Sequence, residues 1–260
     1  MKTALRAVWV FLGLAVLSAC LPLATPLPPL PTDTPAASDT PTPTIVWFPP
    51  TPTHTSLPVA TLPVTPTVDV RPEFGALIFS DDFSQPSQWT LGRFQAGRAA
   101  MAMNELTLAV SQPEGYLYST RQDTSLSDFY LEITASPSIC RDQDQYGLLL
   151  RLSSDVDYYR FALTCDGRTR LDRIYQGNAS APQALIYSGA VPPGAPSMSR
   201  LAVQAIGKEM HFYINGQYQF TIRDPMLPRG TIGVFARADG PDVMTVNFSD
   251  LDVYQAGNAP

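Results

Sequence analysis

The chain has 260 residues, of which 15% are charged and 26 are proline, and its formal net charge is −6. Fifteen of the prolines lie between Pro22 and Pro72, which divides the chain into a leader, a proline-rich segment and a C-terminal part. From Phe74 onward there are 13 Arg and one Lys against 15 Asp and 4 Glu, a net charge of −5. This acidic balance argues against nucleic acid and anionic lipid as partners of that part.

Residues 1–19 have the organisation of a secretory signal peptide. Lys2 and Arg6 form a basic head, and the apolar run AVWVFLGLAVL that follows is too short for a membrane-spanning helix, which needs about 20 residues. The stretch LSAC, ending at Cys20, resembles the lipobox of bacterial lipoproteins. The resemblance implies that Cys20 becomes the acylated N-terminus, so we expect an exported protein that is anchored to a cell-envelope membrane by lipid. An ordinary cleaved signal with a chance cysteine is the alternative.

Residues 20–73 are predicted to form a disordered, Pro/Thr-rich tether behind this anchor. Repeated Pro-Thr pairs, as in TPTPT, remove backbone donors and fix φ, so neither a helix nor a sheet ladder can persist. Such a chain is extended and solvated, at about 3.1 Å per residue. The apolar island IVWF at 45–48 is interpreted either as local collapse or as a segment that docks on the domain or on a partner.

Residues 74–256 are predicted to form one all-β domain, followed by a tail at 257–260. Apolar and polar residues alternate there in short runs bounded by Gly, Asn, Asp and Pro, without a useful helical period. Many strands at this spacing predict a sandwich or a barrel. We expect strands near 76–80, 88–93, 98–103, 105–110, 115–120, 128–135, 145–152, 157–164, 168–174, 184–188, 199–206, 209–214, 217–223, 230–236 and 243–254.

The hairpin MHFYINGQYQFTI carries the clearest turn signal. Asn215-Gly216 is the dipeptide that a type I′ turn prefers, because both positions need a positive φ. The alternation around this turn puts His211 on a strand face, which favours a structural role for it over a ligand role.

Cys140 and Cys165 are predicted to form a disulfide. Two cysteines that remain in an exported chain after acylation of Cys20 favour a single bridge. They bracket two strand-like runs joined by SSDVD, and a hairpin returns its two ends to each other. Zinc is the alternative, but two cysteines without a nearby histidine are too few ligands.

Five phrases of the domain, taken in order, resemble the landmarks of concanavalin A-like jelly rolls, in the laminin-G and keto-disaccharide-hydrolase-like branch. They are FSDDFSQPSQWTLG, YGLLLRLSSDVDYYRFALTCDGRTRL, LAVQAIGKEMHFYINGQYQFTI, GTIGVFARADG and VNFSDLDVY. The resemblance implies an all-β, two-sheet antiparallel jelly-roll sandwich with one outer face available as a glycan platform. It also marks Trp89 as a core residue, and it does not imply a single function.

Catalysis has little support in the sequence. The motif E-x-D-x-x-E of retaining glucanases with this fold is absent, and the four glutamates of the domain are widely separated. Glycoside hydrolysis needs two carboxylates about 5–9 Å apart. The resemblance also implies a structural Ca²⁺ where the first and last strands meet, with Asp82 and Asp250 as its ligands (Asp81 being an alternative to Asp82). The other interpretation of Asp81-Asp82 is a turn at the end of a strand.

Glycan binding needs aromatic faces and polar groups of fixed geometry, for which arginine is well suited. If Leu152 pairs with Tyr158, Arg151 faces Tyr159 on one side of the hairpin, and Tyr158 and Arg160 point to the other side. Periodicity does not decide which side is core, because Leu148, Leu149 and Leu150 are apolar at both parities. The family pattern implies binding roles for Arg151 and Tyr159, and structural roles for both are the alternative. Tyr158 and Arg160 are the candidate ligand residues on the other side.

These observations give three functional hypotheses. The first is a membrane-anchored, surface-displayed, non-catalytic domain that binds carbohydrate or another cell-envelope polymer. The second is a glycoside-acting hydrolase of the same fold, and the third is a structural or adhesive module that binds protein. The sequence predicts neither the ligand nor the oligomeric state.

Overall fold

The computed structural model describes residues 72–257. The predicted signal peptide, Cys20 and the tether up to residue 71 lie outside the described residues, as do residues 258–260. Within the described range, no helix is long and apolar enough to cross a bilayer.

Fifteen strands and one short 3-10 helix make up the described part of the chain. The strands are β1 (Phe74–Asp81), β2 (Gly92–Phe94), β3 (Gly97–Ala102), β4 (Glu105–Val110), β5 (Tyr116–Thr120), β6 (Phe129–Ile139), β7 (Gln145–Ser154), β8 (Asp157–Thr164), β9 (Arg168–Tyr175), β10 (Asn178–Tyr187), β11 (Ser199–Ile206), β12 (Glu209–Ile214), β13 (Gln217–Arg223), β14 (Thr231–Arg237) and β15 (Met244–Ala256), and the helix η1 spans Pro86–Gln88.

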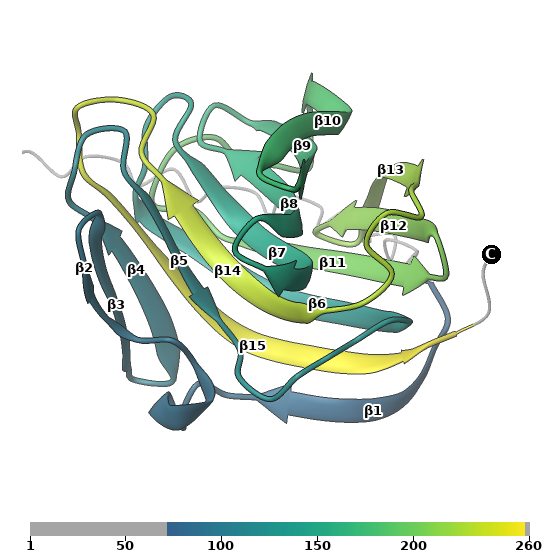
Figure 1. Cartoon of the computed structure of the whole chain (residues 1–260). Coiled ribbons are helices and arrows are strands. Elements are labelled where there is room, and N and C mark those ends of the chain that lie inside the picture. The colour runs from purple at the N-terminus through teal and green to yellow at the C-terminus, as the bar shows by residue number, and fades with distance from the viewer. Residues whose placement is uncertain (1–71, 258–260) are drawn as a thin grey trace, which may run out of the picture. The chain divides into compact units, whose positions relative to one another are not determined.

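The strands form two antiparallel sheets packed as a sandwich (Figure 1). One sheet has six strands in the order β10-β9-β8-β7-β14-β5. The other has nine, with β13-β12-β11-β6-β15-β4-β3-β2 in sequence and β1 paired to β15. The predicted all-β, two-sheet antiparallel sandwich is therefore confirmed.

Strand positions agree with the sequence prediction better than strand lengths do. β6 continues to Ile139 and β10 begins at Asn178, several residues beyond the predicted bounds. The single strand expected near 88–93 is instead the helix η1 followed by the short strand β2. Pro86 begins this helix, and proline is favoured at the first helical position.

The core lies between the two sheets and follows the period-two alternation. In β8, Tyr159, Phe161 and Leu163 point inward and are fully buried, and the intervening residues point outward. Trp89 is also buried, and its indole N–H donates to the carboxylate of Asp81 at 2.9 Å. The prediction that Trp89 is a core residue is confirmed.

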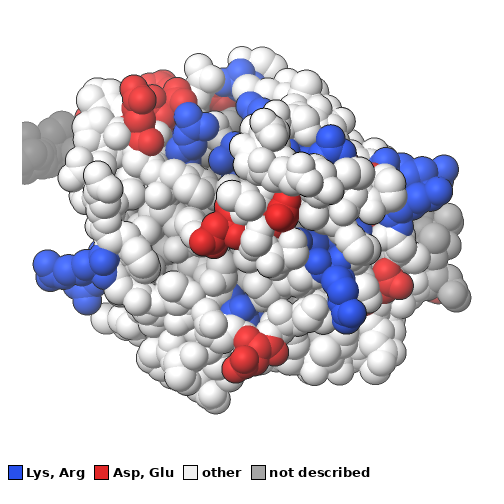
Figure 2. Space-filling view, in the orientation of Figure 1, with Lys and Arg blue, Asp and Glu red and all other residues white. Residues whose placement is uncertain are grey.

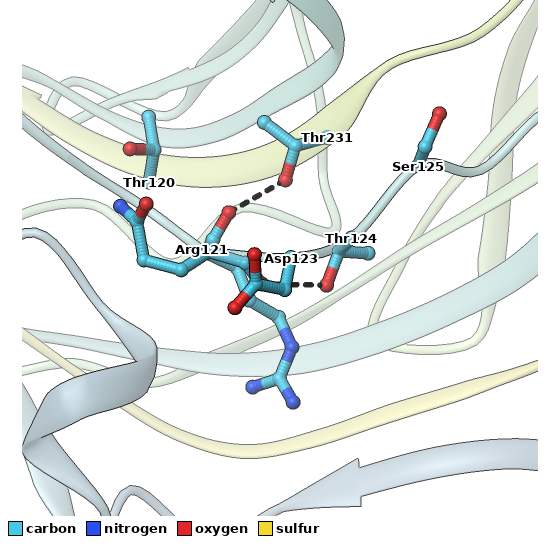
Figure 3. A pocket seen from close by; sticks show the side chains of 7 residues that line it. Thr120, Arg121, Asp123, Thr124, Ser125 and Thr231 are labelled. Atoms are coloured by element: carbon cyan, nitrogen blue, oxygen red, sulfur yellow. Dashed lines mark hydrogen bonds between the residues drawn. The ribbon is translucent and has the colours of Figure 1, made fainter.

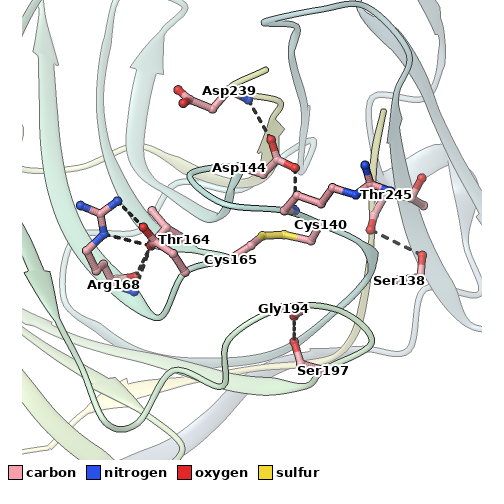
Figure 4. Close-up of a disulfide and its surroundings, with 12 residues drawn as sticks. Ser138, Cys140, Asp144, Thr164, Cys165, Arg168, Gly194, Ser197, Asp239 and Thr245 are labelled. Atoms are coloured by element: carbon pink, nitrogen blue, oxygen red, sulfur yellow. Dashed lines mark hydrogen bonds and ion pairs between the residues drawn. A yellow bond between two sulfur atoms is a disulfide. The ribbon is translucent and has the colours of Figure 1, made fainter. Parts of the chain in front are cut away.

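Two local predictions about the chain are confirmed by the backbone. Asn215 has φ 50° and Gly216 has φ 73°, the positive values that a type I′ hairpin turn requires. Cys140 and Cys165 form a disulfide with a Cα–Cα distance of 5.8 Å (Figure 4). The bridge joins the end of β6 to the β8–β9 turn. Beside it, Asp144 accepts a hydrogen bond from the backbone N–H of Asp239 at 2.9 Å.

Candidate functional site

The structure corrects the predicted pairing of the β7–β8 hairpin. Tyr159 pairs with Leu150, and the next pair is Ser154 with Asp157, so β7 carries a bulge between these pairs. Arg151 lies in this bulge with φ 49°. The extra residues redirect its side chain, which is why Arg151 and Tyr159 do not form a surface pair.

Arg151 is a buried structural residue. Its guanidinium donates to the backbone carbonyls of Ser127 and Gly207, both at 2.8 Å, and to that of Leu227 at 3.2 Å. Burial lowers the pKa of the arginine, which the nearby hydroxyl of Tyr159 and the carboxylate of Asp128 partly offset. Neither Arg151 nor Tyr159 has exposed surface, so the prediction that they form a ligand platform is corrected.

The opposite face of the hairpin points away from the core. Leu149, Ala162 and Phe235 form a second, smaller apolar cluster there, on the outer face of the six-stranded sheet. Four partly buried residues pack against this cluster, Tyr116, Tyr118, Leu152 and Tyr158. Tyr158 and Arg160, the other two predicted ligand residues, therefore lie on the solvent side of β8.

A hollow of about 220 Å³ opens on this face, and we call it the tyrosine pocket. Its lining residues come from β5, β7, the β7–β8 turn and β8, and they are Tyr116, Tyr118, Leu149, Leu152, Asp155 and Tyr158. The register of β14 explains how they meet, because Phe235 pairs with Tyr118 on one side and with Gly147 on the other. β14 thus lies between β5 and β7, which are far apart in sequence, and places their outward side chains on one face of the sheet.

Hydrogen-bonding groups are fixed at the rim of the tyrosine pocket. The hydroxyl of Tyr118 donates to the carboxylate of Asp155 at 3.2 Å. Burial, followed by the Asp155 charge, raises the pKa of Tyr118, and burial, followed by Tyr158, raises the pKa of Tyr116 well above its ordinary value. Both phenols are therefore protonated at neutral pH, and the proton of Tyr118 is given to Asp155.

Arg160 borders the tyrosine pocket without lining it. Its guanidinium lies 5.6 Å from the ring centroids of both Tyr116 and Phe235 and forms an ion pair of 2.7 Å with Asp172. Burial by itself lowers the pKa of Arg160, but the hydrogen bond and the charge of Asp172 outweigh it and the pKa is raised. Arg170 contacts the same carboxylate. The two arginines fix Asp172, and Arg160 in turn supports the ring of Tyr116.

Several residues of the tyrosine pocket were missed by the sequence analysis. Tyr116 and Tyr118 have the two-residue spacing that puts side chains on the same face of a strand, but that face was not known to be the outer one. Asp155 was interpreted as a turn residue, and it is one that also reaches the rim of this pocket.

A separate polar hollow, of about 390 Å³, lies in the loop that follows β5 (Figure 3). Its lining is polar, and its hydroxyls bind the local backbone, as when Thr231 donates to the carbonyl of Arg121 at 2.7 Å. The guanidinium of Arg121 is engaged by the buried carboxylate of Asp81 and lies over Phe79. This hollow is larger than the tyrosine pocket, but it offers no aromatic face and its one cation is already paired.

The remaining predicted site residues have local partners. His211 lies on β12, where its Nδ1 atom is 2.7 Å from the hydroxyl of Thr221, in agreement with a structural role. β1 pairs with β15 as expected, and Asp81 lies opposite Leu251, which brings the neighbouring Asp82 and Asp250 to the same end of the strand pair.

The donor set at that end does not fit a complete calcium site. Asp82 accepts the backbone N–H of Ser84 at 3.0 Å, and Asp250 accepts the hydroxyl of Ser249 at 2.9 Å. Ca²⁺ takes about six to eight oxygen ligands. Residues 72–257 contain no group of three or more acidic, histidine or cysteine side chains arranged for a metal ion. The calcium site stays a prediction.

Comparisons with known proteins bear on the fold. No protein-family model matches the sequence, and no curated protein matches it. Among solved structures, a galectin-like protein of unknown function from Bacillus subtilis aligns with a TM-score of 0.56 and 16% identity, over 72% of this chain and 99% of that one. The chain has a jelly-roll fold. The carbohydrate binding module CBM66 from Bacillus subtilis aligns with this jelly roll at a TM-score of 0.50 and 15% identity, over 65% and 96% of the two chains.

An enzyme domain shares the same jelly roll. The catalytic domain of an endo-1,3-beta-glucanase from Thermotoga petrophila aligns with a TM-score of 0.51 and 10% identity, over 70% of this chain and 98% of that one. At these identities the likeness concerns the fold, and function has to be argued from the side chains at the site.

Proposed function

We propose that this jelly roll is a non-catalytic carbohydrate-binding domain and that the tyrosine pocket is its binding site. One observation carries the proposal: Tyr116, Tyr118 and Tyr158 line a single hollow whose rim holds the carboxylate of Asp155. Aromatic faces pack against the apolar faces of sugar rings, and a few fixed polar groups bond the hydroxyls and set orientation. The carbohydrate binding module and the glucanase domain that share this fold agree with the proposal.

The composition of the tyrosine pocket favours binding over hydrolysis. Asp155 is the one carboxylate among its lining residues. Asp172, which is bound to Arg160 beside the pocket, is also held by Arg170 and is almost fully buried. A glycosidase needs a second carboxyl group in reach of the same bond. A glycoside hydrolase, the alternative function, would therefore have to work with the single available carboxylate of Asp155.

The proposal includes the predicted location of the domain. Acylation of Cys20 and a Pro/Thr-rich tether would display the jelly roll away from a cell-envelope membrane, where it meets extracellular or envelope polymers. The support for this part is the signal-like leader and the LSAC stretch.

A glycan array probed with the full purified chain tests the proposed function. We expect retention of at least one class of oligosaccharide, and a loss of about tenfold or more in Tyr158→Ala, because a stacking ring is removed. Tyr187→Ala is the matched control, since Tyr187 is 80% exposed on β10 and lines none of the pockets described above. Retention of no glycan above background would overturn the proposal, as would equal loss in both variants. Protein-only binding would favour the adhesive module.

A further inference from the structure

Tyr116 lines more than the tyrosine pocket. A second hollow of about 130 Å³ is lined by Thr90, Phe94, Tyr116, Leu117 and Tyr118. A third hollow of about 430 Å³ is lined by Phe94, Gln95, Ala96, Gln112, Pro113, Gly115 and Tyr116. Because Tyr116 lines all three, the hollows adjoin one another at this residue. We call the three hollows together the seam groove.

The seam groove crosses from one sheet to the other. Tyr116 belongs to β5, the last strand of the six-stranded sheet, and Phe94 belongs to β2, the last strand of the nine-stranded sheet. Figure 1 shows β2 and β5 on the same side of the sandwich. The groove therefore runs from the outer face of one sheet, over the place where the sheet edges meet, to the β2–β3 turn.

The floor of this crossing is fixed by hydrogen bonds between the two edges. The backbone N–H of Thr90 donates to the carbonyl of Thr120 at 3.0 Å, and the hydroxyl of Ser119 donates to the carbonyl of Thr90 at 2.8 Å. On the far side, the N–H of Ser111 donates to the carbonyl of Ala96 at 2.9 Å. A floor held in this way is preformed, and ligand sites are usually preformed.

Phe94 gives the seam groove an aromatic surface outside the tyrosine pocket. It is 43% exposed and lines both hollows beyond the tyrosine pocket. The amides of Gln95 and Gln112 stand beside it in the third hollow and can both donate and accept hydrogen bonds. As in the tyrosine pocket, an aromatic ring stands beside polar groups, which here are amides and there are phenols and a carboxylate.

Charge and size together indicate the kind of ligand. No residue that lines the second or the third hollow is charged, and Asp155 gives the tyrosine pocket one negative charge. Because an anionic polymer would meet repulsion without a compensating cation in the lining, an uncharged chain is favoured. The tyrosine pocket of about 220 Å³ is also smaller than the roughly 300–1,000 Å³ of ordinary ligand sites.

We infer that the seam groove binds an internal stretch of a neutral polysaccharide, with the tyrosine pocket as one subsite and Phe94 as another. This inference rests on the proposed function and extends it, because it names the ligand as a neutral chain of several sugar residues. Binding at two connected subsites makes affinity depend on chain length.

The test uses the full chain on arrays printed with homologous oligosaccharides of two to eight units from glucans, mannans, xylans and polyuronates. We expect retention of one neutral series to rise with length by a factor of ten or more and then to level off. Phe94→Ala should remove that rise and leave retention of the shortest member unchanged, and Phe94→Trp should restore it. Tyr158→Ala should weaken every member of the series.

Tyr218→Ala is the matched control, because Tyr218 is a 54% exposed aromatic residue on β13, away from the groove. Equal retention of short and long chains, an unchanged length profile in Phe94→Ala, or preference for polyuronates would overturn the inference while leaving the proposed function in place. Retention of no glycan at all would overturn both.

Discussion

The guanidinium of Arg151 donates a hydrogen bond of 2.8 Å to the backbone carbonyl of Ser127 in the interior, where Arg151 has no exposed surface. The same side chain also binds the carbonyls of Gly207 and Leu227. One residue therefore ties together the β5–β6 loop, the β11–β12 turn and the β13–β14 loop. These segments lie far apart in the sequence.

Arg151→Met should destabilise the domain strongly. The substitution removes the donor from three backbone carbonyls, one of them on the buried residue Leu227, and we expect a loss of about 3 kcal/mol in the free energy of unfolding. Urea denaturation of the full chain measures this. Arg229→Met, at an exposed position, should change the same free energy by less than about 0.5 kcal/mol. Similar values for the two variants would refute the structural role of Arg151.

Reduction of the Cys140–Cys165 disulfide should lower stability by about 3 kcal/mol, because the bridge closes a loop with a sequence separation of 25. Thermal or urea unfolding with and without a phosphine reductant gives the difference. The double variant Cys140→Ser/Cys165→Ser should start at the lower stability and be insensitive to the reductant. A reductant effect that persists in the double variant would show that another change is responsible.

Alkaline pH should destabilise the domain, and Tyr159 should contribute to the loss. Burial raises the pKa of this tyrosine in the folded state, with Asp224 adding to the shift, so folding favours the neutral phenol. The stabilisation is complete below the unfolded value of about 10 and is lost as pH rises above it. Urea denaturation at pH 8 and pH 11 measures how much the free energy of unfolding falls between these pH values. We expect this fall to be about 1 kcal/mol smaller in Tyr159→Phe than in the wild type.

The control for this pH effect is Tyr187→Phe. Water reaches the side chain of Tyr187, which is 80% exposed, so its removal should leave the alkaline loss unchanged. If Tyr159→Phe loses as much stability as the wild type between pH 8 and pH 11, burial of Tyr159 does not govern its titration.

Asp155→Asn should weaken glycan retention by about tenfold without affecting the fold, because a charged acceptor at the rim of the tyrosine pocket becomes a neutral one. Asp242→Asn is the control, since Asp242 pairs with Arg141 on an exposed loop elsewhere. Incubation of both variants and of the wild type with the retained polysaccharide should release no reducing ends. Release by the wild type that Asp155→Asn abolishes would favour the hydrolase.

Cys20→Ser should abolish incorporation of a labelled fatty acid into the protein expressed in a bacterial host that makes lipoproteins. The acyl chains are predicted at this cysteine and at no other. The Cys140→Ser/Cys165→Ser variant should still take up the label. Label that remains in Cys20→Ser, or that never enters the wild type, contradicts the proposed anchor.

The sequence by itself determined the features that depend on neighbouring residues. Alternation at a period of two gave the strands, Asn215-Gly216 gave the positive φ values of its turn, and the spacing of Cys140 and Cys165 around a hairpin gave the disulfide. Each of these rests on backbone geometry within a few residues or within one hairpin. These local features were sufficient to predict the all-β sandwich.

Only the tertiary structure decided which face of β7 and β8 carries the candidate site. Leu148, Leu149 and Leu150 are apolar at both parities, and the bulge at Arg151 shifts the register, so the strand pattern is compatible with either face. The pairing of β14 with both β5 and β7 then brings Tyr116 beside Tyr158. Such contacts depend on the order of the strands in the sheet, and the alternation of apolar and polar residues along a single strand does not determine that order.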